Sequence, residues 1–370
     1  MENRLRIGLD VAPLLYPYSG VRAYVEALID SSRNGDTGVD LVPISAPSGL
    51  LRSSSKIARL NWDLRGIAVA ARGSKVELLH MTRFAAPRRF DGPLIVTVHD
   101  LIPLQLPEYR SSRPARIQSA LARALVPHAT RVIVPSSYVA GVVQELLRIE
   151  RERIDVIPMG VSPVEEPPAA PVLSGPYVLH TGGFDARKNL TMLLQAFARA
   201  SWELGPDWRL VLVGSPHSNN PVVYPPVEPV IEQLGLGDRV VRTGRVDEQE
   251  KNALYAHASI AVNPSRSEGF GLPILEAMAH GVPVVASNRT SHPEVAGDAA
   301  FLVEPTVEAF SEAMIELATD DALRTALSAK GRARCRVSMV AHRPRDHRDI
   351  QSCPRRRSKV ARELSVKGPS

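Results

Sequence analysis

The chain has little of what marks secreted, membrane-spanning or metal-binding proteins. Its 370 residues include only two cysteines, Cys335 and Cys353, which cannot form a disulfide framework. It contains no run of about 18 apolar residues, so we expect no transmembrane helix. The first residues lead into a strand instead of a signal-peptide core, and a D-x-D metal motif is absent from residues 1–333. These absences predict a cytoplasmic protein with no metal site.

The positive charge of the chain is concentrated at its C-terminal end. The formal net charge is +6, but residues 331–370 alone hold 12 Lys and Arg against 3 Asp and Glu. The other 330 residues hold 33 basic and 36 acidic groups, so the folded body has no basic character and we expect it to bind no nucleic acid. The length is sufficient for two domains, each with its own core.

The most informative stretch follows an apolar run at residues 260–262, which is typical of a buried strand. Gly269 and Gly271 then open a segment with helical spacing of apolar residues. A strand, a glycine turn and a helix start present free backbone N–H groups to a phosphate. Here those groups belong to Phe270, Gly271 and Leu272.

Two carboxylates bracket this turn. Glu268 precedes it, and Glu276 lies about one helical turn inside the helix. Carboxylates repel phosphate, so we interpret them as acceptors of hydrogen bonds from hydroxyl groups on either side of a phosphate, as in a nucleotide sugar. For either residue alone a simpler interpretation stays open, in which Glu268 is solvated and Glu276 is an ordinary acid near a helix N-terminus.

A dinucleotide-binding site is the weaker interpretation of the same glycines. The G-x-G-x-x-G fingerprint needs a small third residue for close packing of helix on strand, and it usually opens the fold. Here Ile274 occupies the third position, and the stretch lies late in the chain. A dehydrogenase is therefore disfavoured.

The string E-G-F-G-L-P-I-L-E-A-M-A-H-G-V-P-V-V-A-S, from Glu268 to Ser287, resembles the E-x₇-E motif of glycosyltransferase family 4. Members are retaining enzymes with the GT-B fold, in which two Rossmann-like α/β domains with parallel sheets face a central cleft. The resemblance covers about residues 5–330. It implies metal-independent transfer of a hexose, such as mannose or glucose, to a glycan, lipid-linked or small-molecule acceptor. The donor would be a nucleoside diphosphate sugar, with no further cofactor.

The resemblance also assigns residues in the first half of the chain. Gly20 lies in a glycine loop before an amphipathic helix, where the family brings the backbone close to the donor. His99 matches the histidine of the family's T-x-H-D segment, which contacts the donor sugar. Without the resemblance, a lone histidine at a strand end is more often structural, and Asp100 beside it either orients the imidazole or caps the next turn.

Arg187 and Lys188 follow a second glycine turn and precede a helix. Cations are unfavourable at the positive end of a helix unless an anion is bound there, so the pair predicts a diphosphate clamp. Lys188 matches the lysine of the family's G-R-x(n)-K-N segment. The arginine of that segment is replaced by Gly183, so either Arg187 supplies the missing charge or Lys188 acts alone.

Together these assignments give each residue a role. Lys188 and Arg187, with the backbone N–H groups of residues 270–272, would stabilise the leaving diphosphate. Glu276 would bind the ribose hydroxyls. Glu268 would hold the hydroxyls of the donor sugar, and His99 would contact that sugar from the other domain.

The chain divides into an N-terminal acceptor domain at 1–162, a proline-rich linker at 163–173 and a nucleotide-sugar domain at 174–333. From about Arg334 the helical pattern stops and a basic tail, 334–370, begins. A one-base shift at Met339-Val340 gives tryptophan and then an ordinary family ending, so we hypothesise a frameshifted tail. The alternative is a native, disordered one.

Two other functions remain open from the sequence. A GT-B-type sugar-nucleotide epimerase would consume the same donor without an acceptor. A catalytically impaired nucleotide-sugar-binding protein would bind the donor and turn nothing over. A basic tail also predicts peripheral contact with anionic lipid at the inner face of the membrane.

Overall fold

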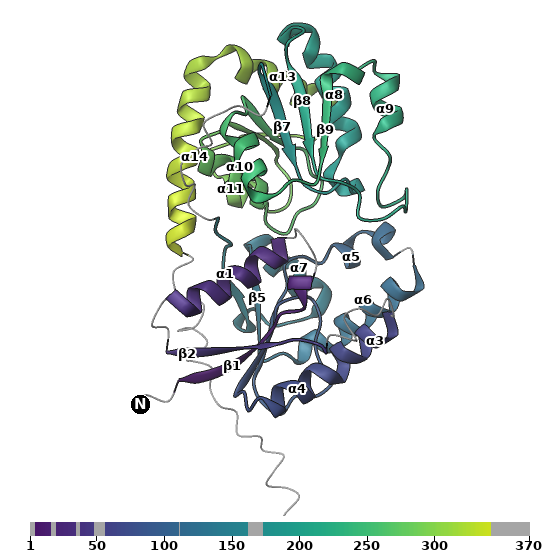
Figure 1. Ribbon diagram of the computed structural model, residues 1–370, viewed down its shortest axis with the longest axis vertical. Helices are drawn as coiled ribbons and strands as arrows, with labels where there is room; N and C mark the ends of the chain where they lie inside the picture. Colours follow the sequence, from purple (N-terminus) through teal and green to yellow (C-terminus); the bar gives the residue numbers. More distant parts are fainter. Residues whose placement is uncertain are drawn as a thin grey trace, which may run out of the picture.

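A computed structural model of the chain consists of two α/β domains stacked along its long axis (Figure 1). Each domain contains a six-stranded parallel sheet with helices packed against it. This arrangement confirms the prediction of two Rossmann-like domains. The residues that the structure describes are 4–15, 20–34, 38–47, 56–110, 112–161 and 173–341.

The first sheet has the strand order β2-β1-β3-β4-β5-β6, and all of its strands are parallel. Its inner strands are continuous apolar runs because helices cover both faces, as parallel sheets require. The strands are β1 Leu5–Asp10, β2 Val39–Ile44, β3 Leu78–Met81, β4 Leu94–Thr97, β5 Arg131–Val134 and β6 Ile154–Val156. The helices are η1 Ala12–Leu15, α1 Gly20–Asn34, α3 Lys56–Asn61, η2 Trp62–Gly66, α4 Ile67–Gly73, α5 Ile102–Gln105, η3 Pro107–Arg110, α6 Arg113–Leu125, η4 Val126–His128, α7 Ser137–Leu147 and η5 Arg151–Arg153.

The second sheet has the order β12-β11-β10-β7-β8-β9 and is also entirely parallel. Its strands are β7 Tyr177–Thr181, β8 Arg209–Val213, β9 Val240–Gly244, β10 Ile260–Asn263, β11 Val284–Ser287 and β12 Phe301–Val303. The helices are η6 Ala186–Lys188, α8 Leu190–Leu204, α9 Glu228–Gln233, η7 Gly237–Arg239, α10 Glu248–Ala256, α11 Leu272–His280, α12 His292–Ala296, α13 Val307–Thr319 and α14 Asp321–Ala341.

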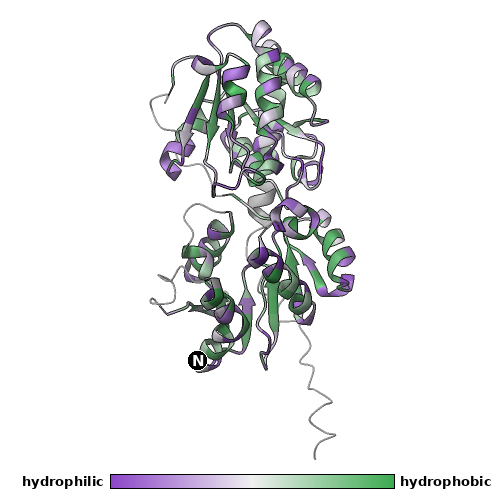
Figure 2. Ribbon diagram, turned by 90° about the vertical axis from the view of Figure 1, so that its right-hand side faces the viewer, coloured by the Kyte–Doolittle hydropathy of each residue, from purple (hydrophilic) through white to green (hydrophobic). Residues whose placement is uncertain are grey.

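The strands of both sheets consist mainly of hydrophobic residues, whereas the helices carry hydrophobic and hydrophilic residues in turn (Figure 2). One cluster of buried side chains fills the first domain around β3, β4 and β5, and another fills the second domain between α8, α13 and the sheet. A third cluster joins α1 of the first domain to α11 of the second. The two domains therefore meet through packed side chains beside the carboxyl ends of both sheets, where open α/β sheets bind ligands.

Helix α14 corrects the prediction that the helical pattern stops at about Arg334. The helix continues to Ala341 and runs along one side of the second domain, down towards the first (Figure 1). The Arg334 guanidinium donates to the carbonyls of Glu294, at 2.6 Å, and Val295, at 3.1 Å, and Cys335 is buried. These contacts stabilise the part of α14 at Arg334 and Cys335, where the composition of the sequence predicted no helix. Residues 342–370, and with them most of the proposed tail, lie outside the described residues, as does most of the linker.

Among the described residues, no helix is both long enough and apolar enough to cross a membrane.

Candidate functional site

The glycine turn before α11 forms the centre of the site. β10 is buried along its whole length, and α11 begins at Leu272 after Gly271, whose φ of 116° favours a residue without a Cβ. Within the described part of the chain, the N–H groups of Phe270, Gly271 and Leu272 donate to no protein acceptor. Three free N–H groups at the start of a nine-residue helix can bind a phosphate.

The segment after β11 fixes this turn from behind. The Ser291 hydroxyl donates to the carbonyls of Phe270, at 2.6 Å, and Glu268, at 3.1 Å. The Thr290 hydroxyl accepts from the Glu268 N–H at 3.1 Å. The turn is therefore held in place before any ligand arrives, which lowers the entropic cost of binding.

The Glu268 carboxylate is paired with both predicted cations. Its Oε1 accepts from Lys188 Nζ at 2.5 Å, and its Oε2 pairs with the Arg187 guanidinium. Burial alone would raise the pKa of the Glu268 carboxyl, but the charges of Arg187 and Lys188 outweigh it and hold that pKa well below the usual range. The structure thus brings Arg187, Lys188 and Glu268 together, although about 80 residues separate the carboxylate from the cations.

Arg187 is engaged by more than Glu268. Its Nε donates to Asp185 Oδ1 at 2.9 Å, and one of its terminal nitrogens donates to the Ser267 carbonyl at 3.0 Å. These contacts tie η6 to the loop before α11. The only hydrogen-bond partner of the Lys188 ammonium among the described residues is Glu268, so Lys188 keeps N–H donors for a phosphate and Arg187 mainly orders the loop.

Glu276 belongs to a second cluster of polar side chains, with Lys251 and Tyr255, that is separate from the Glu268 cluster. Its carboxylate accepts from Lys251 Nζ at 2.9 Å and from the Tyr255 hydroxyl at 3.1 Å. The Tyr255 hydroxyl also lies 2.5 Å from Thr181 Oγ1, at the end of β7. Glu276 is therefore oriented by two donors and keeps acceptor capacity for hydroxyl groups.

The first domain approaches the glycine turn at two points. A Cβ added to Gly20 would lie 3.2 Å from Leu272 Cδ1, so the start of α1 faces the start of α11. A Cβ added to Gly269 would overlap the His99 carbonyl oxygen. Gly20 and His99, both predicted site residues, thus lie against the donor turn of the other domain.

The imidazole of His99 is neutral and held in one orientation. Its Nε2 donates to the Thr82 carbonyl at 3.1 Å, and its ring packs edge-on against Tyr24 with centroids 5.0 Å apart. Burial lowers the pKa of His99 to about 4. Asp100 does not orient the imidazole but caps the next turn, since its Oδ1 accepts from the Ile102 N–H at 3.1 Å.

Two buried histidines near Glu268 were not among the residues predicted from the sequence. His292 Nδ1 lies 2.9 Å from the Ser287 hydroxyl and 3.1 Å from the Ser287 carbonyl. That hydroxyl donates to the Ser265 carbonyl, so Nδ1 must carry the proton and Nε2 is a bare acceptor. Among the described residues, His292 Nε2 has no hydrogen-bond partner.

His180, at the end of β7, repeats the pattern. Its Nδ1 donates to the Val262 carbonyl at 3.1 Å, and its Nε2 is buried without a partner among the described residues. Burial lowers the pKa of both imidazoles, His180 and His292, to about 4. A histidine at a strand end was a usable signal for His180, whereas nothing local in the sequence marks His292.

Further hydrogen bonds hold the domains closed over the site. The Ser136 hydroxyl donates to the Gly269 carbonyl at 2.7 Å. The Glu294 carboxylate accepts from the N–H groups of Ser137, at 2.8 and 2.9 Å, and Tyr138, at 3.3 Å, at the start of α7. Glu268 and Lys188 are both buried in this closed arrangement.

Within the described ranges, no group of three or more His, Cys, Asp or Glu side chains is arranged to hold a metal ion.

Two family models match the chain, one in each half. The model of Glycosyltransferase Family 4 matches residues 25–165, and that of Glycosyl transferases group 1 matches residues 166–334. Together they cover residues 25–334, which is the whole second sheet and all strands of the first except β1.

Curated relatives include mannosyltransferases. The O-antigen chain mannosyltransferase B of Escherichia coli is 32% identical over 286 residues, which cover 73% of this chain and 72% of that protein. The MMP alpha-(1->4)-mannosyltransferase of Mycolicibacterium hassiacum is 33% identical over 160 residues, 42% of this chain and 37% of that protein.

Solved structures with the same fold are more distant in sequence. Sucrose-phosphate synthase from Thermosynechococcus elongatus superposes with a TM-score of 0.71 at 21% identity, covering 98% of this chain and 99% of that one. Anabaena HepE in complex with UDP and glucose has a TM-score of 0.68 at 18% identity, covering 95% of this chain and 100% of that one. At these identities the likeness shows the GT-B fold alone.

Proposed function

The chain belongs to glycosyltransferase family 4, and from this membership we propose that it transfers mannose from a nucleoside diphosphate mannose to a glycan chain. It is a GT-B hexosyltransferase that uses a sugar donor. The observation that carries the assignment of the donor site is the pairing of Glu268 with Lys188 beside three free N–H groups. The mannosyltransferase names of the relatives support the choice of sugar, and O-antigen assembly by the first relative supports a glycan acceptor.

The diphosphate would lie between Lys188 and the N–H groups of residues 270–272. Charge-assisted hydrogen bonds from an ammonium and a helix start stabilise an anion that grows more negative as it leaves. Glu276 would accept from the ribose hydroxyls beside Lys251 and Tyr255. Glu268, on the opposite side of the turn, would accept from hydroxyls of the mannose, and His99 would border that sugar from the first domain.

The reaction breaks the bond between the anomeric carbon and the diphosphate oxygen, and the electron pair goes to the diphosphate. The new bond forms between the anomeric carbon and an acceptor oxygen on the same face, so the configuration is retained. The acceptor proton passes to the departing diphosphate oxygen. In this scheme no side chain serves as a nucleophile, and the protein acts by position and charge.

An epimerase is not favoured, because the curated relatives are transferases and the family models are those of glycosyltransferases.

The first test is thermal unfolding with UDP, GDP, ADP and TDP, for the wild type and Glu276→Ala. A nucleotide at about 100 times its Kd adds about 2.7 kcal/mol of stability. We expect one nucleotide to raise the Tm of the wild type and to lose most of this effect in the variant. The matched control is Glu248→Ala, which removes the exposed partner of Lys251 and leaves Glu276 in place.

The thermal shift identifies the nucleotide base. Transfer is then measured with sugar nucleotides that contain this base, starting with GDP-mannose and UDP-glucose. The expected product is a glycan lengthened by one α-linked mannose. A clear nucleotide-dependent rise in Tm, combined with release of free sugar and no transfer to any glycan, would contradict the acceptor proposal.

Peripheral membrane contact is a separate part of the proposal. The helical stretch α3-η2-α4 has two exposed apolar side chains, Ile57 (73% exposed) and Val69 (60% exposed). Arg59 and Arg65 on the same stretch are also exposed. Apolar and basic side chains on one helix are suited to an anionic interface. Flotation with vesicles containing anionic lipid should recover the wild type and not Ile57→Ser/Val69→Ser, and equal recovery would exclude this helix.

A further inference from the structure

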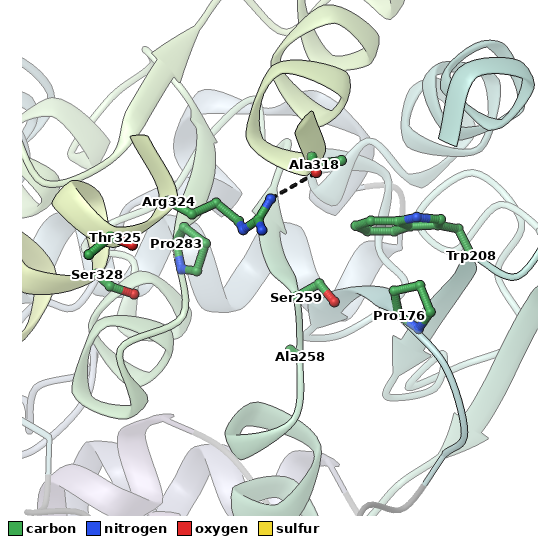
Figure 3. A pocket seen from close by; sticks show the side chains of 9 residues that line it. All are labelled: Pro176, Trp208, Ala258, Ser259, Pro283, Ala318, Arg324, Thr325 and Ser328. Atoms are coloured by element: carbon green, nitrogen blue, oxygen red, sulfur yellow. Dashed lines mark hydrogen bonds between the residues drawn. The ribbon is translucent and has the colours of Figure 1, made fainter. Parts of the chain in front are cut away.

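A cavity of about 570 Å³ lies at the end of the second domain that is remote from the donor site. It opens where strands β7, β8, β10 and β11 begin, whereas the donor turn lies where β10 ends. Its walls combine the Trp208 ring, Pro176, Pro283, Ser259 and Arg324, with further residues of α13 and α14 (Figure 3). Its volume lies within the range of about 300–1,000 Å³ found for small-molecule sites.

We propose that this cavity binds a neutral carbohydrate, such as a segment of the glycan chain itself, as a second site separate from the transferase centre.

The charge of the cavity disfavours an anionic ligand. Among the described residues that line it, only Arg324 is ionic. One terminal nitrogen of Arg324 donates to the carbonyls of Leu317 and Ala318, each at 2.8 Å, and the other pairs with Asp321. The guanidinium thus closes the C-terminal end of α13, where a cation is favourable, and its charge is already balanced. A phosphate or carboxylate would find no uncompensated cation here.

The remaining chemistry suits a sugar. In Figure 3 the Trp208 ring and the Arg324 side chain flank an open space with the Ser259 hydroxyl below it. Thr325 and Ser328 lie beyond Arg324, and their hydroxyls, which donate to the carbonyls of Asp321 and Gly281, keep lone pairs as acceptors. A sugar ring has an apolar face that stacks on an aromatic ring and a rim of hydroxyls that bond to polar groups. The cavity offers both kinds of surface.

The tryptophan is presented on a fixed backbone. The Arg239 guanidinium donates to the carbonyls of Gly205, at 2.6 Å, Trp208, at 3.3 Å, and Ser201, at 3.4 Å. It thereby joins the end of α8 to the start of β8 and leaves the Trp208 ring as a wall of the cavity. A site ordered in advance loses less entropy when a ligand binds.

The site would serve a glycosyltransferase by holding a distant part of a long acceptor, and this role rests on the proposed function. Binding at the cavity does not depend on that role, so the two are tested separately.

The experiment measures binding of linear mannohexaose, maltohexaose and UMP to the full chain by calorimetry and saturation-transfer NMR. We expect at least one hexasaccharide to bind the wild type and Trp208→Ala to weaken it about tenfold, as the loss of an aromatic stacking contact should. Trp202→Ala is the matched control. That side chain is 89% exposed on α8, which precedes Trp208 in the chain, and it does not line the cavity, so its loss should change the affinity less than about twofold.

Ala318→Phe gives a second, independent variant, since it fills the cavity from α13 without removing the tryptophan. It should also abolish glycan binding. Both cavity variants should keep the rise in Tm produced by the nucleotide, which reports the donor site. With the proposed function intact, Trp208→Ala should raise the KM for a long acceptor about tenfold and leave that for a monosaccharide acceptor unchanged.

Any one of three outcomes would refute the proposed carbohydrate site. The first is that neither hexasaccharide binds the wild type, and the second is that binding survives both Trp208→Ala and Ala318→Phe. The third is that UMP binds in a manner sensitive to Trp208 while the glycans do not. A protein that binds a hexasaccharide through Trp208 but transfers no sugar would retain the site and refute the proposed function alone.

Discussion

The phenol of Tyr109, in the first domain, donates a 2.5 Å hydrogen bond to Asp185 Oδ1 in the second. The same carboxylate oxygen accepts from Arg187 Nε at 2.9 Å, and Arg187 in turn pairs with Glu268. Burial and the Asp185 charge raise the pKa of Tyr109, so the phenol stays protonated and remains a donor. The contact between the domains is thus connected through three interactions to the Glu268 carboxylate of the proposed donor site.

Tyr109→Phe should weaken closure without unfolding either domain. The loss of one hydrogen bond to a charged group costs about 1.5–3 kcal/mol when the contact forms, so kcat/KM should fall about 10- to 100-fold with little change in Tm. Tyr138→Phe is the control, because its phenol oxygen accepts from Gln105 within the first domain. Equal kinetics for the two variants would mean that the Tyr109 bond plays no part in closure.

Glu268→Gln should separate nucleotide binding from transfer. The amide cannot neutralise Arg187 and Lys188, and an unpaired buried charge costs about 3–5 kcal/mol, so the ligand-free variant should melt at a lower temperature. A diphosphate restores the missing negative charge, so its stabilising effect should be larger than in the wild type. Transfer should fall at least about 100-fold, because the acceptor for the sugar hydroxyls is impaired.

Thermal shifts and initial rates measured side by side check this prediction. Glu312→Gln, at an exposed carboxylate on α13, controls for loss of charge alone. An unchanged increment in Tm on nucleotide addition would show that Glu268 does not balance the Lys188 charge that is proposed to face the diphosphate.

The sequence was sufficient to predict the two sheets and the turn at Glu268. Apolar runs, closely spaced glycines and helical spacing of apolar residues can each be recognised within a short segment of the chain. The sequence also indicated Lys188, since cations at a helix start need an anion. The Tyr109–Asp185 bond and the neighbours of His292 join segments far apart in the chain, and only the packed domains bring them together. The path of α14 past Arg334 likewise depends on two carbonyls of α12, which composition does not record.

The buried histidines predict a loss of stability in weak acid. For His180 and His292 the folded pKa is about 4 and the unfolded value is about 6.5. The unfolded chain therefore binds protons that the folded chain excludes as the pH falls from 6.5 towards 4. The stabilisation is complete above pH 6.5, and by pH 5 each imidazole should have cost about 2 kcal/mol.

The measurement is urea denaturation at pH 7, 6 and 5. His292→Asn cannot titrate, but its amide can still donate to Ser287, so its stability should fall by about 2 kcal/mol less than that of the wild type between pH 7 and 5. His128→Asn, at an exposed position, should follow the wild type. Parallel curves for all three proteins would refute the assignment of a bare, uncharged imidazole at position 292.

Gly269 is the position at which the smallest change should block closure. Its own φ is not among the positive values, so alanine is compatible with its backbone, but a methyl group there would overlap the His99 carbonyl oxygen of the other domain. Backbone on both sides cannot yield as a side-chain tip would, so Gly269→Ala should hold the domains apart. We expect a larger radius of gyration by small-angle scattering, near-normal Tm and a loss of transfer of at least about 100-fold, since an open cleft no longer positions the reacting groups.

Gly141→Ala makes the same chemical change inside α7, where no atom lies within 4 Å of the added methyl group. Replacing a helical glycine by alanine should stabilise that control by about 0.5–1 kcal/mol and leave transfer intact. A compact, active Gly269→Ala protein would show that catalysis does not need the contact between the glycine turn and the strand end at His99.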